Sequence, residues 1–90
     1  MTTPITDHHP AGVDITETLD CSGLLCPLPV YKAALVLGRL ADGDVLRLIT
    51  TDPGALEDIP AMARQRGDTL LGFEKDDTTQ VFFVRKGGTS

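Results

Sequence analysis

Residues 26–41 read CPLPVYKAALVLGRLA, and this stretch fixes where the first helix of the chain lies. Proline is tolerated in the first turn of a helix, because its missing N–H has no intrahelical partner there. Pro27 and Pro29 therefore predict a helix that begins at about Cys26, and Asp42-Gly43 is expected to end it. The apolar residues of this helix recur at helical spacing and form one stripe: Val30, Ala33, Ala34, Leu37, Leu40 and Ala41.

Strands are predicted on both sides of this helix. Residues 13–19 alternate apolar and polar side chains, which indicates a half-buried strand. A turn is expected at residues 20–23, where Gly23 can adopt a positive φ. After the helix, residues 45–50 are mostly apolar and predict a strand that is covered on at least one face.

A second helix is predicted to end at Arg66, with Gly67 as its stop. The start of this helix is open, because Pro60 inside a helix would remove a backbone hydrogen bond. Either Asp58 caps the helix, or an earlier turn joins it at a kink.

The last part of the chain predicts a hairpin. Residues 69–75 and 80–86 have strand character and surround a turn at residues 76–79. The element order is then β-α-β-α-β-β, and its short connections place both helices on the same side of the sheet. We expect an α+β fold: a two-layer α/β sandwich with a four-stranded mixed sheet and two helices on one face.

Length and composition are those of one small globular domain. The chain has 90 residues, of which 41% are hydrophobic and 23% are charged. We expect a single domain at residues 13–87, between a disordered tail at 1–12 and a short tail at 88–90. No run of about 18 apolar residues suggests a membrane span. Residues 1–10 lack the basic and apolar stretches of a secretory signal, so the expected location is the cytoplasm.

Charge and cysteine content exclude several classes of function. The formal net charge is −5, with eight Lys and Arg against 13 Asp and Glu, which argues against direct binding of nucleic acid. Protein partners fit an acidic surface better. Two cysteines are too few for a disulfide scaffold or a structural zinc site, so we expect free thiols and no bound metal.

Cys26 is the strongest candidate for a catalytic residue. A thiolate at a helix start is stabilised by unpaired N–H groups and by the helix dipole, and the thiolate is the reactive form of cysteine. This reasoning predicts a lowered pKa for Cys26. Gly23, Pro27 and Pro29 are expected to position the helix start beside the thiol. The alternative is that Cys26 is a small buried apolar side chain.

The motifs around Cys26 resemble those of the TusA/SirA-type sulfur carriers, the sulfurtransferase TusA family. The motifs are LDCSGLLCPLP at residues 19–29, TDPGA at 51–55, DIP at 58–60, and Gly67 after the second helix. The resemblance covers nearly the whole chain, from Ile15 to Lys86.

The resemblance implies both a fold and a function. Family members have the β-α-β-α-β-β fold, and the cysteine of the motif, Cys26 here, accepts sulfane sulfur as a persulfide and passes it to another protein. The donors are cysteine desulfurases or rhodanese-like proteins. The sulfur is used for tRNA 2-thiouridine, molybdenum cofactor or dissimilatory sulfur oxidation. Such a protein is a covalent relay rather than a stand-alone enzyme, and it needs no cofactor.

The chain departs from the family pattern at two places. Members of the tRNA-thiolation type often carry basic residues eight or nine positions after the cysteine, where this chain has Ala34 and Leu35. Gly-His often follows the second helix, where this chain has Gly67 and Asp68. The missing basic residues favour sulfur oxidation. An acidic carrier that docks on two partners is most simply a monomer.

Cys21 leaves alternative functions open. It is either a second thiol that relays sulfur or forms a disulfide with Cys26, or a buried side chain. A thiol–disulfide redox switch using both cysteines is therefore an alternative function, although redox pairs usually have Cys-x-x-Cys spacing. A non-catalytic regulatory domain that shares the fold is another.

The remaining candidate site residues flank the thiol. Asp20 and Asp52 are expected to support turns rather than to act as catalytic carboxylates. Leu28, Tyr31 and Lys32 lie near the helix start and are candidates for docking a partner protein. Partial packing is the alternative for Leu28 and Tyr31.

Overall fold

Four strands and two helices follow one another in the order that the sequence predicts. The computed structural model describes residues 14–87, and the tails expected at residues 1–12 and 88–90 lie outside this range. Within it, neither helix has the length and apolar character that crossing a membrane requires. The elements are β1 (Glu17–Cys21), α1 (Leu28–Arg39), β2 (Val45–Thr50), α2 (Ala55–Arg66), β3 (Thr69–Asp76) and β4 (Thr79–Arg85).

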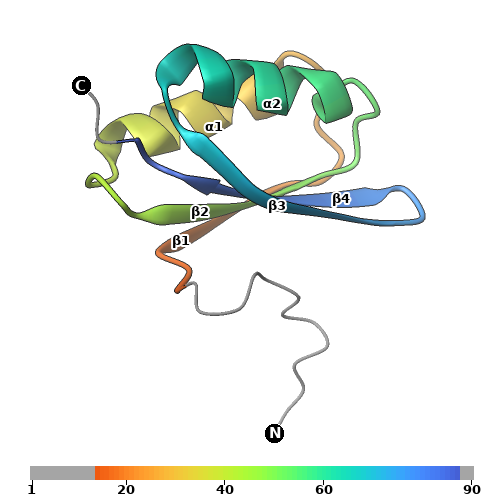
Figure 1. Ribbon diagram of the computed structural model, residues 1–90. Coiled ribbons are helices and arrows are strands. Elements are labelled where there is room, and N and C mark those ends of the chain that lie inside the picture. Colours follow the sequence, from red (N-terminus) through yellow and green to blue (C-terminus); the bar gives the residue numbers. More distant parts are fainter. Residues whose placement is uncertain (1–13, 88–90) are drawn as a thin grey trace, which may run out of the picture.

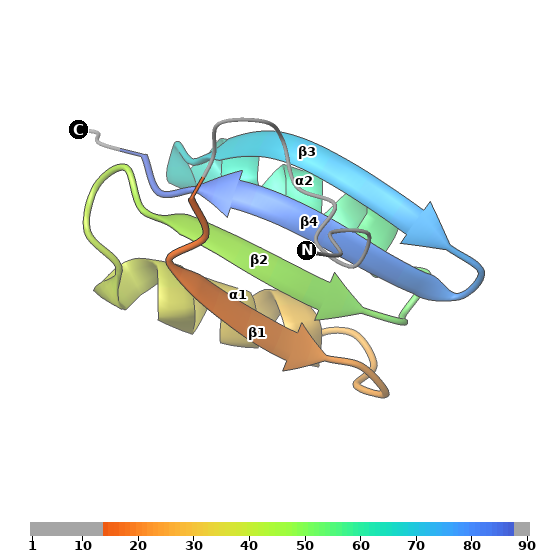
Figure 2. The same cartoon turned by 90° about the horizontal axis from the view of Figure 1, so that it is seen from below.

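The strands form one mixed sheet, and both helices cover the same face of it (Figure 1). The strand order is β1-β2-β4-β3. Strand β1 is parallel to β2, whereas β4 is antiparallel to both β2 and β3. Seen from the side opposite the helices, the four strands lie next to one another in this order (Figure 2). The predicted fold class is confirmed.

Strand β1 lies further along the chain than the predicted strand at residues 13–19. It pairs with β2 from Glu17 opposite Leu46 to Cys21 opposite Thr50. The alternation of buried and exposed side chains is the predicted one, but it continues through Cys21, which is fully buried. Pairing with a neighbouring strand decides where a strand ends, and the local pattern does not contain that information.

Helix α1 is shorter than predicted at both ends. Pro27 occupies the N-cap position, so the first helical residue is Leu28 rather than a residue near Cys26. At the other end, Leu40 has an extended backbone with φ −82° and ψ 157°. Val36 joins the buried face, whereas Ala41 lies beyond the helix and is exposed.

Helix α2 follows the earlier of the two predicted starts. Its N-cap is Gly54, and Asp58 lies in the first turn rather than at the cap. Pro60 lies inside the helix, where it removes one backbone hydrogen bond. Gly67 ends the helix with φ 84°, a left-handed conformation that glycine adopts without a steric penalty.

The core lies between the helices and the sheet. A fully buried Leu, Ile, Val or Phe side chain stabilises the fold by about 1.5–3 kcal/mol relative to an exposed one. The largest apolar side chains of the core come from both layers: Leu37 from α1, Ile59 from α2, Leu46 and Leu48 from β2, and Phe82 and Val84 from β4.

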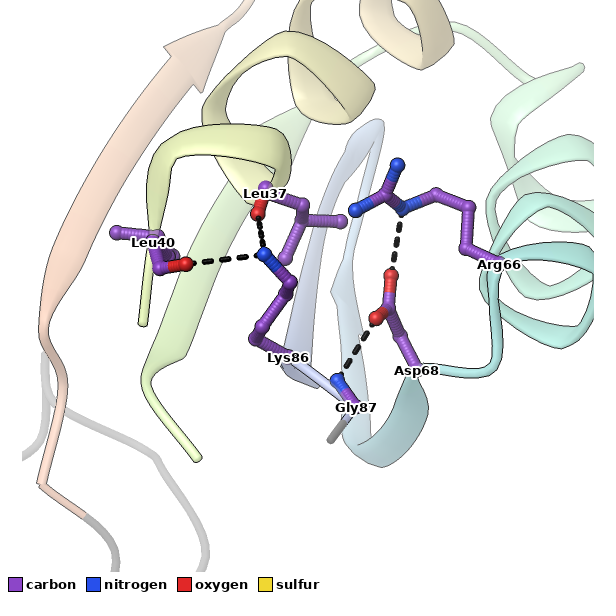
Figure 3. Close-up of polar contacts among 6 residues, drawn as sticks. All are labelled: Leu37, Leu40, Arg66, Asp68, Lys86 and Gly87. Carbon is purple, nitrogen blue, oxygen red and sulfur yellow. Dashed lines mark hydrogen bonds and ion pairs between the residues drawn. The ribbon is translucent and has the colours of Figure 1, made fainter. Parts of the chain in front are cut away.

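The end of β4 is tied to the C-terminal ends of both helices (Figure 3). The Lys86 amine donates hydrogen bonds to the Leu37 carbonyl at 2.7 Å and the Leu40 carbonyl at 2.9 Å. A cation at the last carbonyls of a helix satisfies unpaired acceptors and matches the helix dipole. One residue further, the Gly87 N–H donates to the Asp68 carboxylate, which also binds the Arg66 guanidinium.

The contact of Lys86 with α1 is testable by substitution. Lys86→Met keeps most of the side-chain length but removes the charged donor, so we expect the free energy of unfolding to fall by about 1–3 kcal/mol in urea denaturation. Lys75→Met is the matched control, because that amine makes an exposed hydrogen bond to the Asp77 carbonyl within the hairpin. Equal losses in the two variants would show that the Lys86 contacts do not stabilise the fold.

Candidate functional site

Two loops meet at one edge of the sheet. They are residues 22–27, after β1, and residues 51–54, after β2. The parallel strands β1 and β2 end at the same edge of the sheet (Figure 2). Their register places Cys21 opposite Thr50. The Gly23 N–H donates to the Thr51 hydroxyl at 2.8 Å, so the loops are hydrogen-bonded to each other as well as adjacent.

A tight turn follows β1 immediately. The Asp20 carboxylate accepts hydrogen bonds from the Ser22 N–H at 2.9 Å and from the Ser22 hydroxyl at 2.6 Å. These two bonds lower the pKa of Asp20, because they stabilise the charged carboxylate. Gly23 has φ 82°, a conformation that residues with a Cβ rarely adopt. Asp20 and Gly23 therefore shape the turn that leads to Cys26.

Asp52 braces the loop that carries Cys26. One carboxylate oxygen accepts the Cys26 N–H at 2.9 Å, and the other accepts the Gly54 N–H at 3.3 Å. Its side chain is buried in this position, and the residue is only 8% exposed. Asp52 thus holds the thiol-bearing backbone against the start of α2.

The Cys26 thiol is exposed, and it contacts a second carboxylate. Its Sγ donates a hydrogen bond to an Asp58 oxygen at 3.3 Å. This bond stabilises the protonated thiol and is the main reason that the pKa of Cys26 is raised. Partial desolvation and the charges of Asp58 and Asp52 act in the same direction.

The lowered pKa predicted for Cys26 is therefore wrong. Helix α1 begins at Leu28, two residues beyond the cysteine, and its first backbone donors are already engaged or missing. The Cys26 N–H is bound by Asp52, the Leu28 N–H donates to the Leu25 carbonyl, and Pro27 has no N–H. The Asp58 carboxylate at hydrogen-bond distance from the thiol sets the direction of the shift.

Cys21, the second cysteine, is inaccessible to solvent. It is fully buried in the core between the sheet and the helices, and it is a free thiol. Burial raises its pKa, and the positive charge of Lys32 partly offsets this effect. The structure brings Cys21 to the base of the loop that carries Cys26.

Several large apolar side chains on the loop of Cys26 and on both helices face solvent. Leu28 and Tyr31, two of the predicted docking residues, are 44% and 61% exposed, and Lys32 is also exposed. Sequence reasoning missed three further large apolar side chains that face solvent. Leu25 precedes Cys26, Leu35 lies on α1, and Leu56 lies at the start of α2. Leu28, Tyr31 and Leu35 recur at helical spacing, so α1 has an apolar stripe on its exposed side too.

Sequence reasoning also missed two residues that bind the loop of Cys26. Thr51 binds the Gly23 N–H and Asp58 binds the Cys26 thiol. The predicted β-α-β order contained a signal for both, because the two strands of such a unit run parallel and the segments that follow them meet at one edge of the sheet. Among residues 14–87, no three His, Cys, Asp or Glu side chains are grouped so that they could hold a metal ion.

The site is one exposed cysteine thiol on a loop that Asp52 braces, in a small α+β domain. Comparison with known proteins identifies the family. The family described as sulfurtransferase TusA matches residues 17–86. The chain belongs to the TusA family of sulfur carriers.

Relatives and a solved structure agree with this assignment. The sulfur carrier protein TusA of Allochromatium vinosum is 38% identical over 73 residues, which are 81% of this chain and 96% of that protein. A longer protein of Aquifex aeolicus is 44% identical over 70 residues, and the matched part is 36% of its length. The crystal structure of a SirA-like protein from Desulfitobacterium hafniense covers 79% of this chain, with a TM-score of 0.70 and 26% identity, and 97% of that chain is covered.

The brace formed by Asp52 leads to a stability prediction. Asp52→Ala leaves two backbone N–H groups without their acceptor, so we expect the free energy of unfolding to fall by about 1–3 kcal/mol. Hydrogen exchange at the Cys26 amide should accelerate more than exchange in the hairpin. Asp42→Ala is the control, because Asp42 is exposed and precedes β2, whereas the loop of Asp52 follows the other end of that strand. Unchanged exchange at Cys26 would contradict the assigned role.

The raised pKa of Cys26 predicts how its reactivity depends on pH. Only the thiolate reacts rapidly with iodoacetamide, so the rate should follow ionisation of Cys26. We expect the midpoint for the folded protein to lie at higher pH than that for the urea-unfolded chain. Mass spectrometry assigns the modified residue, and buried Cys21 should react far more slowly in the folded protein. A midpoint at or below the unfolded value would contradict the geometry.

Proposed function

We propose that this protein carries sulfane sulfur as a persulfide on Cys26 and passes it to an acceptor protein. The observation that carries the proposal is the exposed thiol, on a loop that is hydrogen-bonded to the loop after β2 and lies inside the region that matches the family. A carrier must present its cysteine to two different proteins in turn. An exposed thiol at the edge of a rigid sheet meets that requirement.

The proposed transfer leaves the total number of disulfide-type bonds unchanged. The Cys26 thiol first loses its proton, and the thiolate attacks the outer sulfur of a persulfide on the donor protein. A bond forms between Cys26 Sγ and that sulfur, while the bond between that sulfur and the donor cysteine breaks. The donor leaves as a thiolate. The same exchange, with the carrier as donor, loads the acceptor.

Protein partners of two kinds follow from this function. We propose a cysteine desulfurase or a rhodanese-like protein as the donor and another sulfur-relay protein as the acceptor. The exposed side chains Leu25, Leu28 and Tyr31 beside the thiol supply the apolar contact area that a docking partner would cover. The carrier is proposed to act as a monomer and not to bind nucleic acid, in keeping with its net charge of −5.

The protein is proposed to act as a relay rather than as a stand-alone enzyme, since the bond it breaks is delivered by a partner. We propose the cytoplasm as its location, because a reducing compartment keeps both cysteines as thiols. Ala34 and Leu35 stand where basic residues mark the tRNA-thiolation type, which favours dissimilatory sulfur oxidation as the pathway.

Burial of Cys21 bears on the alternative of a redox switch. A disulfide between Cys21 and Cys26 would require Cys21 to leave the core, where it is fully enclosed. We therefore propose that Cys21 is a packing residue and that sulfur transfer needs Cys26 alone.

Loading with a small sulfur donor tests the proposal. The reduced wild type, Cys26→Ser and Cys21→Ser proteins are incubated with polysulfide, and their intact masses are measured. We expect the wild type and Cys21→Ser to gain sulfur and Cys26→Ser to gain none. Circular dichroism of each variant verifies that it is folded.

Three other outcomes would each contradict the proposal. A mass gain of sulfur that persists in Cys26→Ser and disappears in Cys21→Ser would assign the chemistry to Cys21. Loss of two hydrogens without added sulfur would indicate a redox switch. A wild type that gains nothing would leave Cys26 without the proposed role.

A further inference from the structure

We propose that Asp58 makes Cys26 selective for sulfur donors that carry a cationic group beside the sulfur they transfer. The inference rests on the proposed function and adds the class of donor to it. In this proposal Asp58 contacts both the Cys26 thiol and the cationic group of the donor.

The geometry places Asp58 at the reacting atom. Its carboxylate oxygen lies 3.3 Å from Cys26 Sγ and accepts the thiol proton. Asp58 belongs to the first turn of α2, whereas the thiol belongs to the loop before α1, so two elements must pack in register for this contact. The Asp52 bridge to the Cys26 N–H fixes that register. The free carrier therefore holds its thiol in the protonated form.

Both charged side chains that contact Cys26 are negative. The Asp52 carboxylate binds the Cys26 N–H, and the Asp58 carboxylate binds its thiol. In the described part of the chain, no ion pair includes either carboxylate. Lys32, further along α1, makes no ion pair with them either. A cationic group of the donor therefore pairs with Asp58 without displacing another ion pair.

A cationic donor resolves the conflict between an acidic neighbour and a reaction that needs a thiolate. When a positive group pairs with Asp58, the carboxylate no longer repels the anion that forms on sulfur. The thiol proton passes to water, and the thiolate attacks the donor sulfur. An anionic donor adds repulsion at the same point and reacts more slowly.

The alternative is that Asp58 only stabilises helix α2, and the experiment must distinguish this role from the proposed one. Acidic residues in the first turn of a helix stabilise it through the helix dipole, and both Glu57 and Asp58 lie in the first turn of α2. Glu57→Gln removes one such charge without touching the thiol, so it is the matched control for Asp58→Asn.

Two small disulfides with the same two-methylene spacer and opposite charge make the test specific. Cystamine carries an ammonium group on each side, and 3,3′-dithiodipropionate carries a carboxylate. In each reaction the Cys26 thiolate forms a mixed disulfide and releases one thiolate of the reagent. The rates at Cys26 are measured by quenching and mass spectrometry at neutral pH and low salt.

We expect the ratio of the cystamine rate to the dithiodipropionate rate to be about two- to fivefold larger in the wild type than in Asp58→Asn, the range of an exposed charge pair. The ratio should persist in Glu57→Gln and shrink at high salt. Dithiodipropionate alone should react faster with Asp58→Asn than with the wild type, because its repulsion is lost and the thiol ionises more readily.

Equal ratios in the wild type and Asp58→Asn would overturn the inference, and so would an equal fall in both variants. Such results leave the proposed function intact if polysulfide still loads Cys26. Failure of polysulfide to load the wild type would instead overturn the proposed function, whichever disulfide reacts faster.

Discussion

The parallel pairing of β1 with β2 is the constraint on which the site depends. It ends both strands at one edge, with Cys21 opposite Thr50, and so forces the next residues of each strand into contact. The Gly23–Thr51 and Cys26–Asp52 hydrogen bonds exist because of that pairing. Antiparallel strands would have placed the two loops at opposite edges of the sheet.

Two aspartates give the thiol a character that a helix end alone would not. Asp52 binds backbone, so its effect is mainly positional, whereas Asp58 binds sulfur and favours the neutral thiol. A thiol that stays protonated in the free protein suits a carrier. An exposed, strongly ionised cysteine would react with many small oxidants and electrophiles, whereas one that ionises on contact with a partner reacts where transfer is needed.

The two ends of α1 differ in their contacts. Its C-terminal end is bound by the Lys86 amine, which joins it to the end of β4. Its N-terminal end presents Cys26 together with Leu28 and Tyr31, which are among the more exposed large apolar side chains of the described chain. The fold thus fixes the helix at one end and offers an apolar surface and a thiol at the other.

The sequence by itself determined the element order and the fold class and made Cys26 the candidate residue, because these depend on local periodicity, on proline and glycine chemistry, and on motif spacing. It did not determine where β1 and α1 begin and end, since strand pairing and the Pro27 cap set those limits. Nor did it determine the state of the thiol. A carboxylate 32 positions away decides that state, and only the packing of α2 against the loop brings Asp58 to the sulfur.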